Sequence, residues 1–96
     1  MHWRTGVTLR IEKTLDEYGT TIKLMGRIRG EELAHLKSEI PAAVRRVTLD
    51  LKEVSLVDTE AIQFLSACES EGIQLLNCSA YIREWIIREK QASIKR

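Results

Sequence analysis

Hydrophobic positions at the start of the chain repeat with the period of a β-strand. Apolar and polar residues alternate between residues 7 and 15, which is the pattern of a strand with one buried face. β-Branched residues then follow between residues 20 and 25, and the turn residues 16–19 end in Gly19, which tolerates a positive φ angle. The pattern predicts a β-hairpin, followed by a connection over the glycine-containing stretch 26–30.

The next segment changes to the period of a helix. Leu33, Leu36 and Ile40 are spaced by three and four residues, which places them on one helical face. Two acidic residues precede them, and negative charge in the first turn suits the helix dipole. The spacing predicts a helix over residues 31–40 that ends or bends at Pro41, because proline disfavours helical geometry in the residue before it.

A third strand is predicted over residues 46–51, where apolar residues return to alternation. Val47, Leu49 and Leu51 are its inward-facing positions. After two charged residues the chain becomes apolar again over residues 54–57. We expect the strand to end at residue 51 and this short apolar run to lead into the next helix.

A second helical period begins at the polar pair Asp58-Thr59. Its apolar positions form one stripe, made of Ala61, Ile62, Leu65 and Cys68. Gly72 follows at the position where glycine favours helix termination. The stripe predicts that Ile62, Leu65 and Cys68 pack onto the sheet.

The C-terminal part contains one more strand and one more helix. The nearly continuous apolar run over residues 73–76 is typical of a strand buried on both faces. Ser79 is a preferred N-cap residue, so the last helix is expected to begin after it. The stripe of this helix contains Ile82, Trp85, Ile86 and Glu89.

The predicted order is strand, strand, helix, strand, helix, strand, helix. Strands that alternate with helices favour right-handed crossovers and parallel pairing, and the first hairpin adds an antiparallel pair. We therefore expect an α/β fold with a mixed, mostly parallel four-stranded sheet and about three helices. The domain is expected to span residues 7–90, with flexible termini at residues 1–6 and 91–96.

Composition limits the classes of function. The 96 residues are 44% apolar and 30% charged, which is ordinary for a single globular domain and unlike a disordered chain. A formal net charge of +1 provides no field that would attract nucleic acid. Direct membrane insertion is not expected either, because no stretch reaches the roughly 20 apolar residues that span a bilayer.

The two cysteines, Cys68 and Cys78, indicate the redox environment. They show neither CxxC spacing nor a nearby histidine pair. We interpret them as small buried side chains in a reducing compartment, and we expect no metal site and no cofactor. The N-terminal residues lack the apolar run of a signal peptide, so a cytoplasmic location is expected.

Motifs of common active sites are missing from the sequence. It contains no GxGxxG, GxxxxGK[ST], HExxH or GxSxG pattern. His2 belongs to a terminal segment and His35 lies on a charged helix, so both are interpreted as surface histidines rather than catalytic bases. The chain is not expected to be an enzyme.

The pair Asp58-Thr59 is the candidate functional site. It places two short polar side chains where the first backbone N–H groups of a helix lack partners. One interpretation is capping, since Asp and Thr are preferred N-cap residues and Glu60 suits the first turn. The other is control by charge, because a phosphate on Thr59 would meet the same amides and the positive end of the helix dipole. The motif alone leaves both interpretations open.

The surroundings of this pair resemble a known family. The relevant residues are the strand over 47–51, Val54, the run Val57-Asp58-Thr59-Glu60-Ala61-Ile62, the stretch Gly72-Ile73-Gln74-Leu75-Leu76-Asn77, and Ser79. Their arrangement resembles the STAS domain, the family of bacterial anti-sigma factor antagonists, over about residues 7–89. That family shows a strand, an Asp-Ser or Asp-Thr pair followed by a small residue and glycine, a helix, a glycine-led strand and a final helix.

The resemblance implies a regulatory role in bacterial signalling and transcription regulation. Thr59 matches the residue that a partner anti-sigma kinase phosphorylates, and Asp58 matches the acid before it. The unphosphorylated antagonist binds the kinase and frees the sigma factor, whereas phosphorylation breaks the complex. Glu60 and Ala61 depart from the family pattern, in which Ser or Gly and then glycine are common, and Glu60 would repel a phosphate on Thr59.

A docking surface for a protein partner is therefore expected around Asp58, Thr59, Glu60 and Ile62. The partner implied by the resemblance is an anti-sigma kinase or a regulatory complex. An alternative implied by the same resemblance is an accessory subunit of a stressosome-type complex or of a membrane lipid transporter. A homo-oligomer is compatible with either role.

Overall fold

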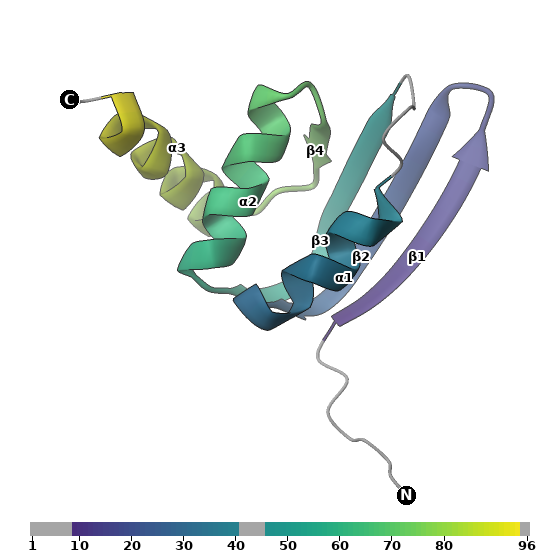
Figure 1. The fold of residues 1–96 in the computed structure, drawn as a ribbon, viewed down its shortest axis with the longest axis horizontal. Coiled ribbons are helices and arrows are strands. Elements are labelled where there is room, and N and C mark those ends of the chain that lie inside the picture. The colour runs from purple at the N-terminus through teal and green to yellow at the C-terminus, as the bar shows by residue number, and fades with distance from the viewer. Residues whose placement is uncertain (1–8, 41–45, 95–96) are drawn as a thin grey trace, which may run out of the picture.

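The computed structural model describes residues 9–40 and 46–94, which form one four-stranded sheet with helices packed beside it (Figure 1). In chain order the elements are β1 (Leu9–Asp16), β2 (Gly19–Ile28), the short 3₁₀ helix η1 (Gly30–Glu32), α1 (Leu33–Glu39), β3 (Val47–Val57), α2 (Thr59–Ser70), β4 (Gln74–Leu76) and α3 (Ala80–Ile94). This order confirms the predicted α/β fold class. Pro41 and residues 1–6 lie outside the described residues, so the predictions made for them stay predictions.

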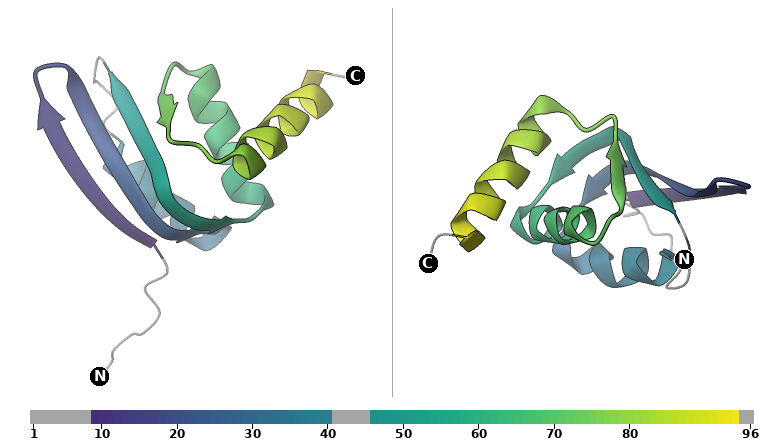
Figure 2. Two further views of the ribbon diagram at one scale, coloured as in Figure 1. Left: turned by 180° about the vertical axis from the view of Figure 1, so that it is seen from behind. Right: turned by 90° about the horizontal axis from the view of Figure 1, so that it is seen from above.

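The strands follow one another across the sheet in the order β1-β2-β3-β4. β1 and β2 pair antiparallel, whereas β2 with β3 and β3 with β4 pair parallel. Both parallel connections therefore advance in the same direction, and right-handed crossovers then place their helices on the same face of the sheet. Figure 2 shows α1 and α2 together on that face, with α3 beside α2.

The hydrophobic core lies between the sheet and this layer of helices. Alternate residues of β2 and β3 point toward the helices, because side chains alternate between the two faces of a strand. The largest fully buried side chains come from both layers and are Ile22, Leu24, Ile28, Leu36, Leu49, Leu51, Ile62, Leu65, Ile82 and Ile86. Together with the buried Cys68, they confirm that the apolar stripe of α2 packs onto the sheet.

The two central strands are longer than the sequence pattern predicted. β2 continues through Gly26 to Ile28, and β3 continues to Val57, which lies opposite Ile28. The register between the strands shifts between Lys23 and Met25 and again between Gly26 and Arg27, and each time β3 has one residue more than β2, as at a β-bulge. Gly26, between the two shifts, adopts a φ of 104°. The prediction that the connection begins at residue 26 is therefore wrong, because the glycines that indicated a loop include Gly26, which lies within β2. The prediction that the third strand ends at residue 51 is also wrong, because the register shifts interrupt the alternation of β3.

The last strand is short and lies at an edge of the sheet. β4 pairs with β3 only between Thr48 and Asp50, and the side chains of Gln74 and Leu76 are exposed. The prediction of a strand buried on both faces is wrong, because α1 and α2 cover only one face of the sheet at this edge.

Helix α3 begins as predicted. The N–H of Ile82 donates to the Ser79 hydroxyl oxygen at 3.3 Å, and Arg83 N–H donates to the Ser79 carbonyl at 2.9 Å. Of the predicted stripe, Ile82 and Ile86 are buried and Glu89 is half-buried. Ser79 therefore caps the helix and the stripe faces the interior.

Charged side chains join α3 to α2. Glu69 Oε1 accepts hydrogen bonds from Arg83 and Lys90, each at 2.9 Å, and the bond from Arg83 is the main reason that the pKa of Glu69 is lowered. The helix continues to Ile94, beyond the domain boundary predicted at residue 90. Residues 95–96 lie outside the described residues.

Replacing Leu65 by Ala is expected to lower the free energy of unfolding by about 2–5 kcal/mol, because the truncation leaves a cavity at a completely buried position. Gln63 on the same helix is exposed and provides a matched control, for which Ala should change stability by less than about 0.5 kcal/mol. Urea unfolding followed by circular dichroism measures both variants. Equal midpoints for the two would contradict the assigned inner face of α2.

Trp85 should report a partly buried environment. Its side chain packs against the core, and its ring centre lies 6.0 Å from that of Tyr81. In a variant without Trp3, the fluorescence maximum should lie to the blue of exposed indole and move to the red on unfolding. A folded protein that already emits like indole in water would reject this placement.

Candidate functional site

The carboxylate of Asp58 joins the start of α2 to the segment that follows β2. Oδ1 accepts the backbone N–H of Ala61 at 2.9 Å, which is the N-cap bond of the helix. Oδ2 accepts the backbone N–H of Gly30, also at 2.9 Å, from a residue 28 positions earlier in the chain. Asp58 is therefore the predicted cap of α2 and, in addition, a link between two distant segments.

Both hydrogen bonds keep this carboxylate charged. The N–H of Gly30 and then that of Ala61 are the largest causes of a lowered Asp58 pKa, and the positive charge of Arg29 acts in the same direction. Because each carboxylate oxygen already accepts a hydrogen bond from a backbone N–H group, Asp58 has a structural role.

The two residues after the cap are the accessible part of the site. Thr59 is the first residue of α2 and is exposed, and Glu60 is exposed beside it. The Glu60 carboxylate lies directly against Gly30, where a Cβ atom would collide with it. Thr59 is therefore a solvent-exposed residue between two acidic residues, Asp58 and Glu60.

Ile62 does not belong to this surface. Its side chain has 0% exposure and packs in the core with the rest of the apolar stripe. The expectation that Ile62 contacts a partner is therefore corrected, because the same helical spacing that places it near Asp58 turns it toward the sheet.

Residues of η1 complete the site, and the sequence prediction missed them. Gly30 supplies the second amide for Asp58, and the N–H of the preceding Arg29 donates to Glu32 Oε1 at 3.1 Å. The guanidinium of Arg29 also pairs with Glu31. The only local signal was a glycine directly before two acids, which indicates a helix start but not what the glycine contacts.

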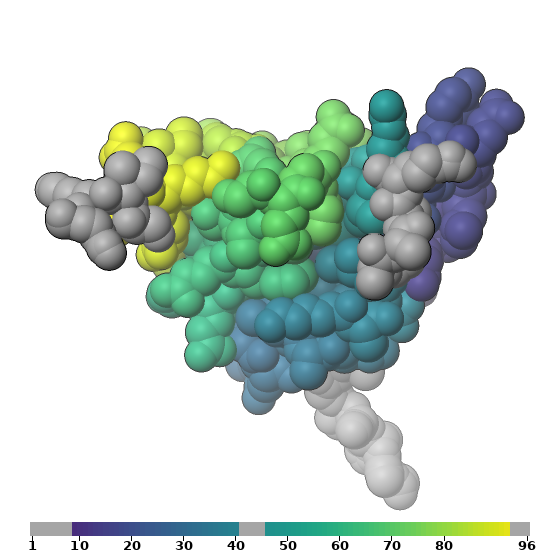
Figure 3. Space-filling view, turned by 45° about the horizontal axis from the view of Figure 1, so that its top comes forward, coloured from purple at the N-terminus to yellow at the C-terminus, as the bar shows by residue number. Residues whose placement is uncertain are grey.

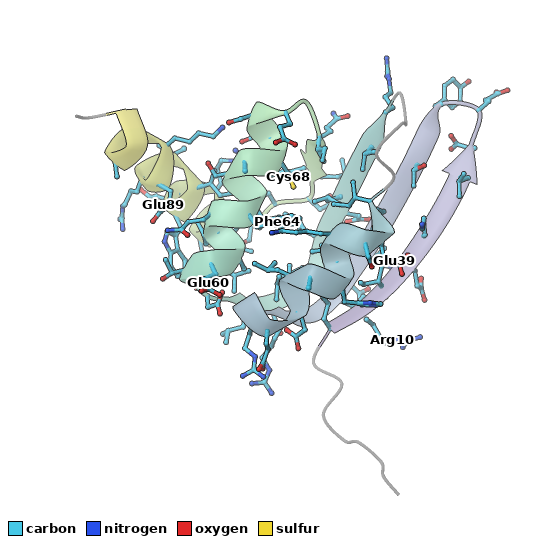
Figure 4. All side chains as sticks on the ribbon, in the orientation of Figure 1. Arg10, Glu39, Glu60, Phe64, Cys68 and Glu89 are labelled. Atoms are coloured by element: carbon cyan, nitrogen blue, oxygen red, sulfur yellow. The ribbon has the colours of Figure 1, made fainter. Side chains whose placement is uncertain are left out.

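A groove between α1 and α2 opens beside the site. Its volume is about 1010 Å³, and Gly30 and Glu60 line one end of it. Glu60, Phe64 and Cys68 lie on successive turns of α2 along the groove (Figure 4), and Lys37 Nζ from α1 lies 5.8 Å from the centre of the Phe64 ring. Figure 3 shows the helices of this face side by side, with α1 in blue and α2 in green.

The cysteines and the histidine in the described part of the chain lie outside this site. Burial raises the pKa of the Cys68 thiol to about 11 and raises that of Cys78 as well, so both remain protonated at neutral pH. His35 is exposed on α1. Within residues 9–40 and 46–94, no cluster of three or more His, Cys, Asp or Glu side chains is arranged to hold a metal ion.

Among the helices in residues 9–40 and 46–94, none is both long enough and apolar enough to cross a bilayer.

Replacing Asp58 by Asn should remove one of its two hydrogen bonds. An amide has one acceptor oxygen and cannot serve the N–H groups of both Gly30 and Ala61, so at neutral pH the free energy of unfolding should fall by about 1–3 kcal/mol. Urea titrations of wild type and variant measure the difference.

The same difference should depend on pH. The folded-state pKa of Asp58 is lowered, so its contribution is complete above 3.8, the ordinary aspartate pKa that applies to the unfolded chain, and is lost as the pH falls through the lower folded value. The stability gap between wild type and Asp58→Asn should therefore close as the pH is lowered below about 4. A gap that stays constant into that range would show that the charge of Asp58 does not matter.

The chain matches no protein-family model, and no curated protein matches it significantly.

Proposed function

We propose that this chain is a cytoplasmic regulatory module of the STAS type that works by binding a protein partner and not by catalysis. The docking surface is formed by Thr59, Glu60 and the adjoining exposed side of α2. Phosphorylation of Thr59 controls the binding. The observation that carries the proposal is the exposed Thr59 hydroxyl directly after a cap whose carboxylate is fully engaged.

The division of roles between Asp58 and Thr59 supports this proposal. Asp58 caps the helix and ties it to Gly30, so Thr59 is not required as the N-cap. A modification of Thr59 can therefore change the surface without removing the bonds that hold the helix in place. This is the property that a reversible switch in a small domain requires.

The charge around Thr59 determines the direction of the switch. A phosphate there would stand beside the ionised Asp58 and the exposed Glu60, and only the helix dipole and the nearby Arg29 would offset the repulsion. Three neighbouring negative groups would bind water strongly, and covering them with a largely apolar partner surface would cost free energy. Phosphorylation is therefore proposed to release the partner.

The exposed side of α2 indicates the chemistry of the partner. The helix contains no lysine or arginine, and the groove beside it combines the apolar ring of Phe64 and the ammonium group of Lys37 with the acids Glu60 and Glu71. A partner that inserts apolar side chains into the groove and donates hydrogen bonds from uncharged amide groups fits this surface. An anti-sigma kinase is the partner that the family resemblance suggests.

Variants of Thr59 test the proposal. Because Asp58 is the cap, both Thr59→Ala and Thr59→Asp should change the free energy of unfolding by less than about 0.5 kcal/mol. Binding to a kinase that co-purifies with the tagged protein should be retained by Thr59→Ala and weakened at least about tenfold by Thr59→Asp, because the added carboxylate would have to be desolvated at the interface without a charge of opposite sign. Ser70→Asp, which adds the same charge at the other end of α2, is the control.

Isothermal titration with the purified partner provides the measurement, and incubation with the kinase and ATP followed by mass spectrometry locates the phosphate. Equal affinity of the Ala and Asp variants for the partner would show that charge at Thr59 does not control binding. A phosphate found only at other positions would reject the switch while leaving the docking surface open to the same binding test.

A further inference from the structure

β1 forms the outer edge of the sheet on the hairpin side. Over its length it pairs with β2, and among the described strands none adjoins its other edge. Such an edge presents a row of main-chain N–H and C=O groups to which another strand can bind. Arg10 lies at this edge, across the sheet from Glu60 (Figure 4).

The hydrogen bonds of β2 show which groups of β1 point outward. The N–H of Thr20 donates at 2.9 Å to the chain entering β3, so the main chain of Thr20 faces β3. Main-chain directions alternate along a strand, so Lys23 faces β1, where its partner is Glu12. The N–H and C=O groups of Ile11 and Lys13, on either side of Glu12, therefore point toward the open edge.

Charges along β1 form a self-complementary pattern. Arg10 and Glu12 lie on the sheet face away from α1, 3.7 Å apart, with 71% and 55% of their side chains exposed. Ile11 lies between them on the opposite face and is half-buried against the core. An antiparallel second copy would present the same two charges in reverse order.

We propose that two copies of this chain associate through β1, antiparallel, about a two-fold axis at Ile11. The outward main-chain groups of Ile11 then bond to those of the partner's Ile11. Arg10 lies opposite the partner's Glu12, and Glu12 lies opposite the partner's Arg10. The two sheets become one continuous sheet, and the half-exposed Ile11 side chains cover each other.

Dimers in the neighbouring registers would be less stable because of electrostatic repulsion. An axis at Glu12 places two glutamates directly opposite each other, and an axis at Lys13 does the same for two lysines. Like charges at directly opposed positions destabilise a strand pair. Only the register centred on Ile11 pairs each of the charges at positions 10 and 12 with its opposite.

Lys13 does not block this edge. A lysine on an outer strand commonly protects against association. Here its ammonium group is 3.3 Å from Glu39 of α1, on the helical side of the sheet. The charge is therefore held above the strand, and the outward main-chain groups beside it stay accessible.

The proposed dimer is independent of the proposed docking surface. β1 is separated from β3 and from the start of α2 by the whole width of β2. Both copies would keep Thr59 exposed, so two partner molecules could bind one dimer. Failure of either proposal leaves the other standing.

Charge-reversal variants of the full chain test the dimer. Sedimentation velocity over a concentration series at low salt should show a monomer–dimer equilibrium for the wild type, weakened by added salt. Arg10→Glu and Glu12→Arg should each raise the dimer dissociation constant at least about tenfold, because each creates two like-charge pairs. An equimolar mixture of these two variants should form a heterodimer, and the double variant Arg10→Glu/Glu12→Arg should dimerise like the wild type.

Thermal unfolding of each variant checks that the monomer still folds, and a variant that does not fold is replaced by Arg10→Gln or Glu12→Gln, for which a smaller weakening is expected. A wild type that sediments as a monomer at all concentrations would overturn the proposal. So would a dimer that is unaffected by Arg10→Glu, since that result would indicate another surface or register. Rescue by mixing the two variants is the outcome that the proposed register requires.

Discussion

The carboxylate of Asp58 accepts one backbone N–H from α2 and one from the segment after β2, and the arrangement of the site depends on this pair of hydrogen bonds. β2 and β3 are parallel and end side by side at Ile28 and Val57, so both chain segments leave the sheet at the same place. Each segment starts a helix, and the first amides of a helix lack partners within it. One ionised side chain satisfies an amide of each, and the position of Thr59 follows from that geometry.

Local features of this fold could be predicted from the sequence, because they depend on neighbouring residues. The Asp58 cap, the inner stripe with Leu65 and the hairpin turn before Gly19 all involve residues within a few positions of one another. Non-local features could not be predicted. Nothing near Gly30 in sequence indicates that its amide meets Asp58. The second half of β3 could not be predicted because the strand has an extra residue at each of two register shifts, which breaks its alternation.

Burial separates residues that look alike in the sequence motif. Asp58, Thr59 and Ile62 lie within five consecutive positions, yet one is bound to two amides, one is exposed and one is in the core. Position along the helix produces this difference, because Asp58 and Thr59 lie at the N-terminal end of α2, where backbone amides need a cap, whereas Ile62 lies one turn further along and packs against the core. The sequence motif therefore combines three different roles: Asp58 holds the structure, Thr59 is accessible to solvent, and Ile62 packs in the core.

The parallel pairing of β2 with β3 has a consequence for the order in which the protein folds. The β1–β2 hairpin closes a two-residue turn and can form within microseconds, whereas β2 and β3 meet only after the intervening helix segment has been looped out. The contact between Gly30 and Asp58, which spans 28 positions, cannot exist before that step. During synthesis the hairpin can form as soon as it leaves the ribosome, but the surface around Thr59 is assembled only once β3 and α2 have emerged. That surface is therefore present on the finished domain and absent from the growing chain.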